Sequence, residues 1–111
     1  MRIEIEPGVR VFVDVEGAGL VADGARMRDK PTLLLLHGGP GYDHSGFKPL
    51  FSQLADIAQI VYYDHRGHGR SDRRPAPEWT LDTFADDVVR LCDALGITKP
   101  IVLGPSFGGF V

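Results

Sequence analysis

Residues 101–108 read I-V-L-G-P-S-F-G, so the pattern G-x-S-x-G directly follows a short apolar run. The apolar run predicts a β-strand, and the glycines predict a sharp turn from this strand into a helix. Such a turn holds its serine in a strained conformation with the hydroxyl group exposed, and it requires small neighbours. Gly104, Gly108 and Gly109 meet that requirement. We therefore predict that Ser106 is a nucleophile at a strand-to-helix turn.

Upstream of this turn, apolar runs alternate with helical patterns. Residues 33–36 and 60–63 are apolar runs too short for helices, which predicts strands buried on both faces. One helix is expected to begin near Pro49, and a second to lie between an N-cap at Thr80 and a C-cap at Gly96. The order strand, helix, strand, helix, strand predicts an α/β fold with parallel strands and crossover helices on both faces.

The N-terminal residues follow a different pattern. Residues 3–6 and 9–15 alternate between apolar and polar side chains around a Pro-Gly pair, which predicts an antiparallel hairpin at one edge of the sheet. Residues 16–30 are rich in Gly, Ala, Asp and Arg and show no sustained period. We expect them to form a surface loop.

Composition and charge exclude several function classes. The chain has 111 residues with 12 basic and 15 acidic side chains and a net charge of −3, and it has no basic cluster that would indicate a nucleic-acid partner. Its apolar runs are far shorter than a membrane span, and residues 1–6 lack the apolar core of a secretory signal. Cys92 is the only cysteine, which excludes an internal disulfide. We expect a cytoplasmic protein with no membrane partner.

A second glycine-rich stretch, H-G-G-P-G at residues 37–41, follows the predicted strand 33–36. If this strand is a neighbour of strand 101–103, the loop exposes backbone N–H groups beside Ser106. Acyl transfer requires two preorganised donors for the oxyanion of its transition state. We expect these donors to be the N–H groups of Gly39 and Phe107.

Three motifs occur in order: H-G-G-P-G at 37–41, D-H-R-G-H-G-R-S at 64–71 and G-P-S-F-G-G at 104–109. Together they make the chain resemble the N-terminal part of an α/β-hydrolase, and in particular the proline iminopeptidase branch. The resemblance implies that residues 1–111 are the N-terminal portion of one domain, ending at the nucleophile elbow. It also implies that the triad acid, the triad histidine and a helical cap come from a C-terminal half beyond Val111, a partner that this chain is expected to need.

The resemblance implies a serine hydrolase that acts through a covalent acyl-enzyme. An aminopeptidase or amide hydrolase of the proline iminopeptidase type, acting on a small molecule or short peptide, is the leading expectation. An esterase, lactonase or thioesterase for small hydrophobic acyl groups is the alternative within this class. A non-catalytic binding module or an inactive fragment is the alternative from another class. No cofactor and no metal is implied.

Four residues on or after the loop at 37–41 are expected to contact the substrate: Gly38, Pro40, Tyr42 and His44. Their place near the carboxyl ends of the strands favours this interpretation.

The remaining histidines are interpreted as structural. His37, His65 and His68 lie on or beside glycine-rich loops, where an imidazole that braces the loop by hydrogen bonds suffices. Asp64 is expected to hold its own turn through a local ion pair with Arg66. No two histidines have helical ligand spacing backed by a third ligand, so the spacing predicts no metal site.

Overall fold

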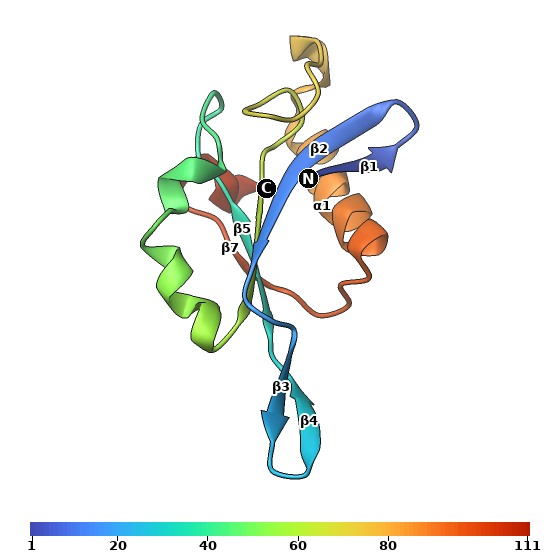
Figure 1. Cartoon of the computed structure of the whole chain (residues 1–111). Helices are drawn as coiled ribbons and strands as arrows, with labels where there is room; N and C mark the ends of the chain where they lie inside the picture. Colours follow the sequence, from blue (N-terminus) through green and yellow to red (C-terminus); the bar gives the residue numbers. More distant parts are fainter.

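The computed structural model describes residues 1–111, whose main sheet has five strands in the order β1-β2-β6-β5-β7 (Figure 1). β5, β6 and β7 are parallel, whereas β2 is antiparallel to both β1 and β6. The predicted α/β arrangement with an antiparallel hairpin at one edge is thus confirmed. The bounds of these strands are β1 Arg2–Glu6, β2 Val9–Glu16, β5 Thr32–Leu36, β6 Gln59–Tyr63 and β7 Ile101–Leu103.

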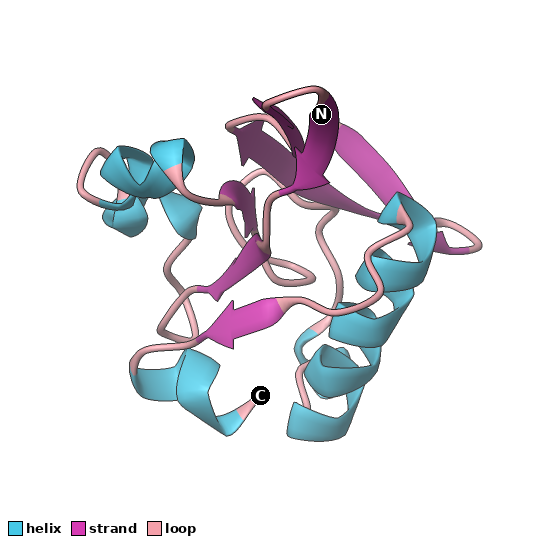
Figure 2. Ribbon diagram, turned by 90° about the horizontal axis from the view of Figure 1, so that it is seen from below, coloured by secondary structure: helices cyan, strands magenta, loops and turns pink.

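The leucines of β5 divide between two cores because successive side chains of a strand point to opposite faces. Leu34 and Leu36 share one core with Leu91 of helix α1 (Leu81–Leu95), and Leu33 and Leu35 share the other with Phe47. Seen end-on, α1 lies on one side of the strands, and the 3₁₀ helices that contain Phe47 and Phe51 lie on the other (Figure 2). The apolar run at 33–36 is therefore continuous because both faces of the sheet are covered.

Helix α1 begins and ends at the predicted residues. The Oγ1 atom of Thr80 accepts a hydrogen bond from the N–H of Thr83 (3.1 Å), and Gly96 ends the helix with φ 70°. Phe84 on α1 lies 5.6 Å from the ring of Phe107, which connects the helix to the segment after β7. No helix is long and apolar enough to cross a lipid bilayer.

The helix expected from Pro49 is correct in place but wrong in type. The chain forms a 3₁₀ helix over Phe51–Asp56, after another over His44–Phe47. The helix over Phe51–Asp56 has no side-chain cap at its start. A segment this short closes few α-helical hydrogen bonds, so the tighter i to i+3 pattern is sufficient for it.

The expectation of a surface loop over residues 16–30 is wrong. Strands β3 (Leu20–Asp23) and β4 (Arg26–Asp29) form a separate hairpin that projects from the main sheet (Figure 1). Asp23 pairs with Arg26, so the two-residue turn is Gly24-Ala25, and Gly24 takes the positive φ (63°) that such a turn requires at its first position. This local signal, rather than a hydrophobic period, predicts the hairpin.

β5 and β7 are neighbours, with Leu33 opposite Ile101 and Leu35 opposite Leu103. The carboxyl ends of the three parallel strands consequently meet at one edge of the sheet. The loops that follow β5, β6 and β7 all lie at this edge, and they contain the three motifs found in the sequence.

Candidate active site

Ser106 lies on the turn between β7 and a 3₁₀ helix (Ser106–Phe110), with its side chain exposed. It has φ 53° and is the only residue other than glycine with a positive φ. A side chain at Gly108 would collide with the carbonyl of Leu36, and one at Gly104 would collide with the backbone of Gly108. The glycines therefore allow the segment after Ser106 to fold back onto the end of β5, and the serine occupies the strained position.

The glycine-rich loop after β5 lies directly beside this serine. A Cβ atom placed on Gly38 would lie 3.6 Å from the Cβ of Ser106 and 3.7 Å from the carbonyl oxygen of Pro105. The proximity that the sequence predicted for the two loops is therefore present. Gly39, the expected oxyanion donor, follows immediately and has φ 124°.

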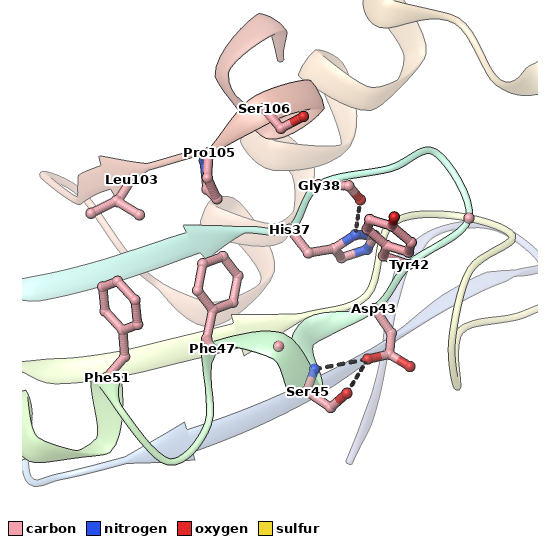
Figure 3. Close-up of a pocket in the computed structure, with 12 residues that line it drawn as sticks. His37, Gly38, Tyr42, Asp43, Ser45, Phe47, Phe51, Leu103, Pro105 and Ser106 are labelled. Atoms are coloured by element: carbon pink, nitrogen blue, oxygen red, sulfur yellow. Dashed lines mark hydrogen bonds between the residues drawn. The ribbon is translucent and has the colours of Figure 1, made fainter.

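Ser106 and this loop border a pocket of about 680 Å³ (Figure 3). The aromatic rings of Phe47 and Phe51, 5.3 Å apart, form part of its apolar wall together with Leu103. The polar part of the lining comes mainly from the loop after β5. The complete lining is His37, Gly38, Gly41, Tyr42, Asp43, Ser45, Gly46, Phe47, Phe51, Leu103, Pro105 and Ser106.

The four residues expected to contact the substrate do not all line the same pocket. Gly38 and Tyr42 line the pocket with Ser106, whereas Pro40 does not. His44 lines a neighbouring, more polar hollow on the other side of the 41–45 segment. The ring of Phe107 turns away from the pocket and packs against Phe84 and His65, so only its backbone is available to a substrate.

His37, His65 and His68 brace the loops around the pocket through hydrogen bonds. The backbone N–H of His65 donates to Nε2 of His37 (3.0 Å), so His37 carries its proton on Nδ1, which donates to the carbonyl of Gly38 (2.7 Å). Burial lowers the pKa of His37, and burial together with the nearby His37 lowers the pKa of His65 to about 3. His68 donates from Nδ1 to the carbonyl of Arg66 (2.8 Å), and its buried Nε2 has no partner.

His44 and Asp64 form a buried pair that the sequence interpretation did not foresee. Nδ1 of His44 lies 2.7 Å from Oδ1 of Asp64, and the carboxyl group is fully buried. Together with Asp43 they offer three possible metal ligands whose donor atoms lie within 4.8 Å of one another. Asp43 and His44 lie on one loop and Asp64 on another, so ligand spacing along the sequence does not reveal this group. A cation would have to displace the hydrogen bond between His44 and Asp64.

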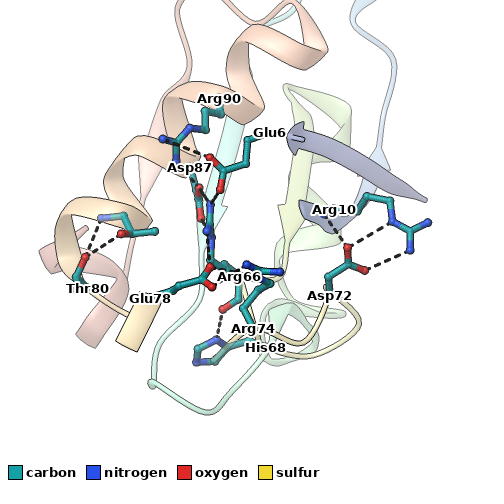
Figure 4. Close-up of polar contacts among 11 residues, drawn as sticks. Glu6, Arg10, Arg66, His68, Asp72, Arg74, Glu78, Thr80, Asp87 and Arg90 are labelled. Atoms are coloured by element: carbon teal, nitrogen blue, oxygen red, sulfur yellow. Dashed lines mark hydrogen bonds and ion pairs between the residues drawn. The ribbon is translucent and has the colours of Figure 1, made fainter. Parts of the chain in front are cut away.

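The predicted ion pair between Asp64 and Arg66 is wrong. Arg66 instead pairs with Asp87 of α1 (2.8 Å), Glu78 (2.7 Å) and Glu6 of β1 (2.6 Å), as Figure 4 shows. Burial by itself would lower the pKa of Arg66, but the hydrogen bonds to these carboxylates outweigh burial and raise it. The guanidinium group therefore ties the loop after β6 to three other elements: α1, β1 and the 3₁₀ helix Ala76–Glu78.

Comparisons with known proteins agree with this geometry. Residues 31–111 match the family described as alpha/beta hydrolase fold. The chain belongs to this family. A proline iminopeptidase, PfmaB, from Pestalotiopsis fici is 37% identical over 103 residues, which are 90% of this chain and 36% of that protein. This alpha/beta hydrolase chain thus spans about a third of the length of that curated relative.

Solved structures of the family superpose on almost the whole chain. The proline iminopeptidase of Mycobacterium smegmatis has a TM-score of 0.79 and 29% identity and covers 98% of this chain and 36% of its own. An esterase from Exiguobacterium antarcticum has the same TM-score, 26% identity and the same two coverages. The printed names of these relatives include both a peptidase and an esterase.

Proposed function

We propose that this chain carries the nucleophile half of a serine hydrolase active site. The observation that carries the proposal is the strained φ of Ser106 on an exposed turn beside Gly38. Oγ of Ser106 attacks the carbonyl carbon of the substrate, and a base takes the hydroxyl proton. The N–H groups of Gly39 and Phe107 stabilise the oxyanion, the leaving group departs with a proton, and water then hydrolyses the acyl-enzyme.

The base is not one of the four histidines of residues 1–111. Only His37 lines the pocket beside Ser106, and both of its ring nitrogens are hydrogen-bonded. His44 lines the neighbouring hollow, and His65 and His68 line neither. We propose that a histidine and an acid from a C-terminal part of the polypeptide complete the triad. The single, partly buried Cys92 favours a reducing, cytoplasmic setting.

The leading substrate class is an amide with a free N-terminal residue, such as a prolyl amide. The name of the fungal relative and the motif at 37–41 support this class. The apolar wall made by Phe47, Phe51 and Leu103 suits a small hydrophobic acyl group, which an ester could also present. The esterase alternative therefore remains the second candidate.

The first experiment applies a fluorophosphonate probe to the complete polypeptide. Labelling is expected on Ser106, retained in the Ser52→Ala control and lost in Ser106→Ala. An unlabelled Ser106 in the unmodified protein would sink the hydrolase proposal. Next, kcat/KM is compared for a prolyl amide and a short-chain aryl ester. Fast ester turnover with negligible amide turnover favours the esterase alternative over the leading class.

Removal of the Gly39 donor tests the oxyanion site. Proline at this position would remove the N–H group but could not adopt φ 124°, so it would also distort the loop. Replacing the Gly39 amide by a backbone ester removes the N–H group alone. We expect kcat to fall by about 10². Unchanged turnover would show that another group stabilises the oxyanion.

A further inference from the structure

The oxyanion loop, residues 37–43, is attached at its first residue to the loop that follows β6, residues 64–71. The N–H of His65 donates to Nε2 of His37 (3.0 Å), and Nε2 of His65 donates to the carbonyl of His37 (3.2 Å). These reciprocal bonds join the start of the oxyanion loop to its neighbour.

A second attachment lies just after the other end of the oxyanion loop. Both the backbone N–H and Nδ1 of His44 lie 2.7 Å from Oδ1 of Asp64. The other carboxylate oxygen, Oδ2, accepts the N–H of Arg70 (2.9 Å). A single buried carboxylate therefore joins both loops, using one oxygen for each.

The surroundings leave Asp64 little freedom. A side chain at Gly69 would collide with the Asp64 carboxylate and would lie 2.9 Å from Cβ of Asp43. Asp64 is fully buried and His44 is 9% exposed. The ring of His44 packs 5.2 Å from Phe12 and 6.2 Å from Tyr62. The pair is thus closely packed at the junction of the two loops.

The segment between the two attachments is the one that faces Ser106. Gly38 lies beside the serine, and Gly41 and Tyr42 line the same pocket. This segment is rich in glycine, so its own side chains restrict the backbone little. Its geometry depends instead on how firmly its two ends are fixed.

We propose that His44 and Asp64 are positioning residues for the oxyanion site, and this inference rests on the proposed hydrolase function. The Nδ1–H of His44 and the carboxylate of Asp64 fix the far end of the oxyanion loop. The backbone N–H of Gly39 thereby stays directed at the oxyanion that forms on attack by Ser106. A displacement of about 1 Å at such a donor lowers turnover strongly without removing any catalytic group.

Three variants separate this role from general loop stability. His44→Leu removes the Nδ1–H donor but keeps an apolar body against Phe12 and Tyr62. His44→Asn keeps an N–H group near the position of Nδ1. Asp64→Asn offers one acceptor oxygen where two are used, so one of the two loops loses its partner.

Asp72→Asn is the matched control. Asp72 lies just beyond the 64–71 loop and accepts the backbone N–H of Arg10 (2.9 Å), and it also pairs with the Arg10 guanidinium. It also pairs with Arg2 of β1 (2.8 Å), so it joins the same region to β1 and β2 and not to the oxyanion loop. Figure 4 shows its contact with Arg10. A loss of general stability would affect this control as much as the variants at His44 and Asp64.

The experiment uses the complete polypeptide. The concentration of reactive active sites is first measured by titration with a fluorophosphonate, so that kcat is calculated per reactive site. For aryl ester hydrolysis, His44→Leu is expected to lower kcat about tenfold and to leave KM within about twofold. A trifluoromethyl ketone, which forms an oxyanion on the serine, should bind more weakly by the same factor as kcat falls. His44→Asn should restore kcat and the affinity for the ketone, and Asp72→Asn should leave both unchanged.

The two proposals fail in different ways. An unmodified protein that does not react at Ser106 removes the proposed function. A reactive protein whose kcat is unchanged in His44→Leu overturns the positioning role, and so does an equal loss in Asp72→Asn. If His44→Leu does not fold, the comparison is between Asp64→Asn and His44→Asn. Loss of kcat in the former alone supports the inference, and equal kcat in both overturns it.

Discussion

The loop that follows β6 and the segment that begins with β7 lie at the same edge of the sheet, but their burial is reversed. Polar residues of the loop are inside, with Asp64 fully buried and Arg66 only 4% exposed. Apolar residues of the segment are outside, with Ile101 56% and Phe110 75% exposed. Polarity alone would predict the opposite arrangement.

The difference follows from partners. Arg66 meets three carboxylates, and Asp64 accepts hydrogen bonds from His44 and Arg70, so burial leaves neither charge uncompensated. β7 pairs with β5 along one side only, and within residues 1–111 no strand lies on its other side. A polar group can be buried where it has hydrogen-bonding or ionic partners, whereas an apolar strand is buried only where other elements pack against it.

Removal of Arg66 should have the largest effect on stability. Arg66→Ala leaves Asp87, which is 1% exposed, with Arg90 as its remaining cationic partner. We expect the free energy of unfolding of the complete polypeptide, measured with urea, to fall by about 3–5 kcal/mol. The control Arg28→Ala removes only an exposed pair with Asp23 and should change it by less than about 0.5 kcal/mol. Equal losses of unfolding free energy in Arg66→Ala and Arg28→Ala would mean that the ion pairs of Arg66 do not stabilise the loop.

Leu35 on β5 and Leu103 on β7 are register partners, so the same substitution at each compares a buried strand with an exposed one. Leu35 is fully buried, so Leu35→Ala should lower the free energy of unfolding by about 2–5 kcal/mol. If the C-terminal part proposed above covers β7, Leu103→Ala should cause a similar loss in the complete polypeptide. Met27→Ala on the projecting hairpin should change it by less than about 0.5 kcal/mol. If Leu103→Ala is as mild as Met27→Ala, β7 remains an open edge.

The buried histidines should make stability depend on pH. Burial, with the nearby His37, lowers the pKa of His65 to about 3, whereas an unfolded chain takes up this proton near pH 6.5. The unfolded state binds more protons between these values, so stability is complete above pH 6.5 and declines as the pH falls toward 3. The slope is up to about 1.4 kcal/mol per pH unit. Urea unfolding at several pH values should show a flatter slope for His65→Gln. An unchanged slope would assign the proton uptake to other groups.

Local patterns predicted much of this fold. The strands over 33–36 and 60–63, the N-terminal hairpin and the caps at Thr80 and Gly96 all follow from a few adjacent residues. The proximity of residues 37–41 to Ser106 followed from strand order, since neighbouring parallel strands end at the same edge. The hairpin at 20–29 was missed although its turn residues signal it.

Partners across long separations could not be predicted. Arg66 and Glu6 are 60 residues apart in the sequence, and His44 and Asp64 are 20 apart. Which carboxylate meets which cation depends on the register of strands and on the rotation of α1, and neither is encoded in the local pattern. Asp64 and Arg66 are two residues apart, which suggested a local pair, whereas the folded chain gives each of them other partners.

The projecting hairpin offers a place to modify the protein far from its chemistry. Its neck is closed by a hydrogen bond from the N–H of Lys30 to the carbonyl of Gly19 (2.8 Å), so residues 19 and 30 are held together whatever lies between them. β4 leads into the start of β5, and the oxyanion loop leaves the other end of that strand. Residues 20–29 can therefore be shortened, or extended with a fluorophore or a surface tether, without redirecting the strands that support Ser106.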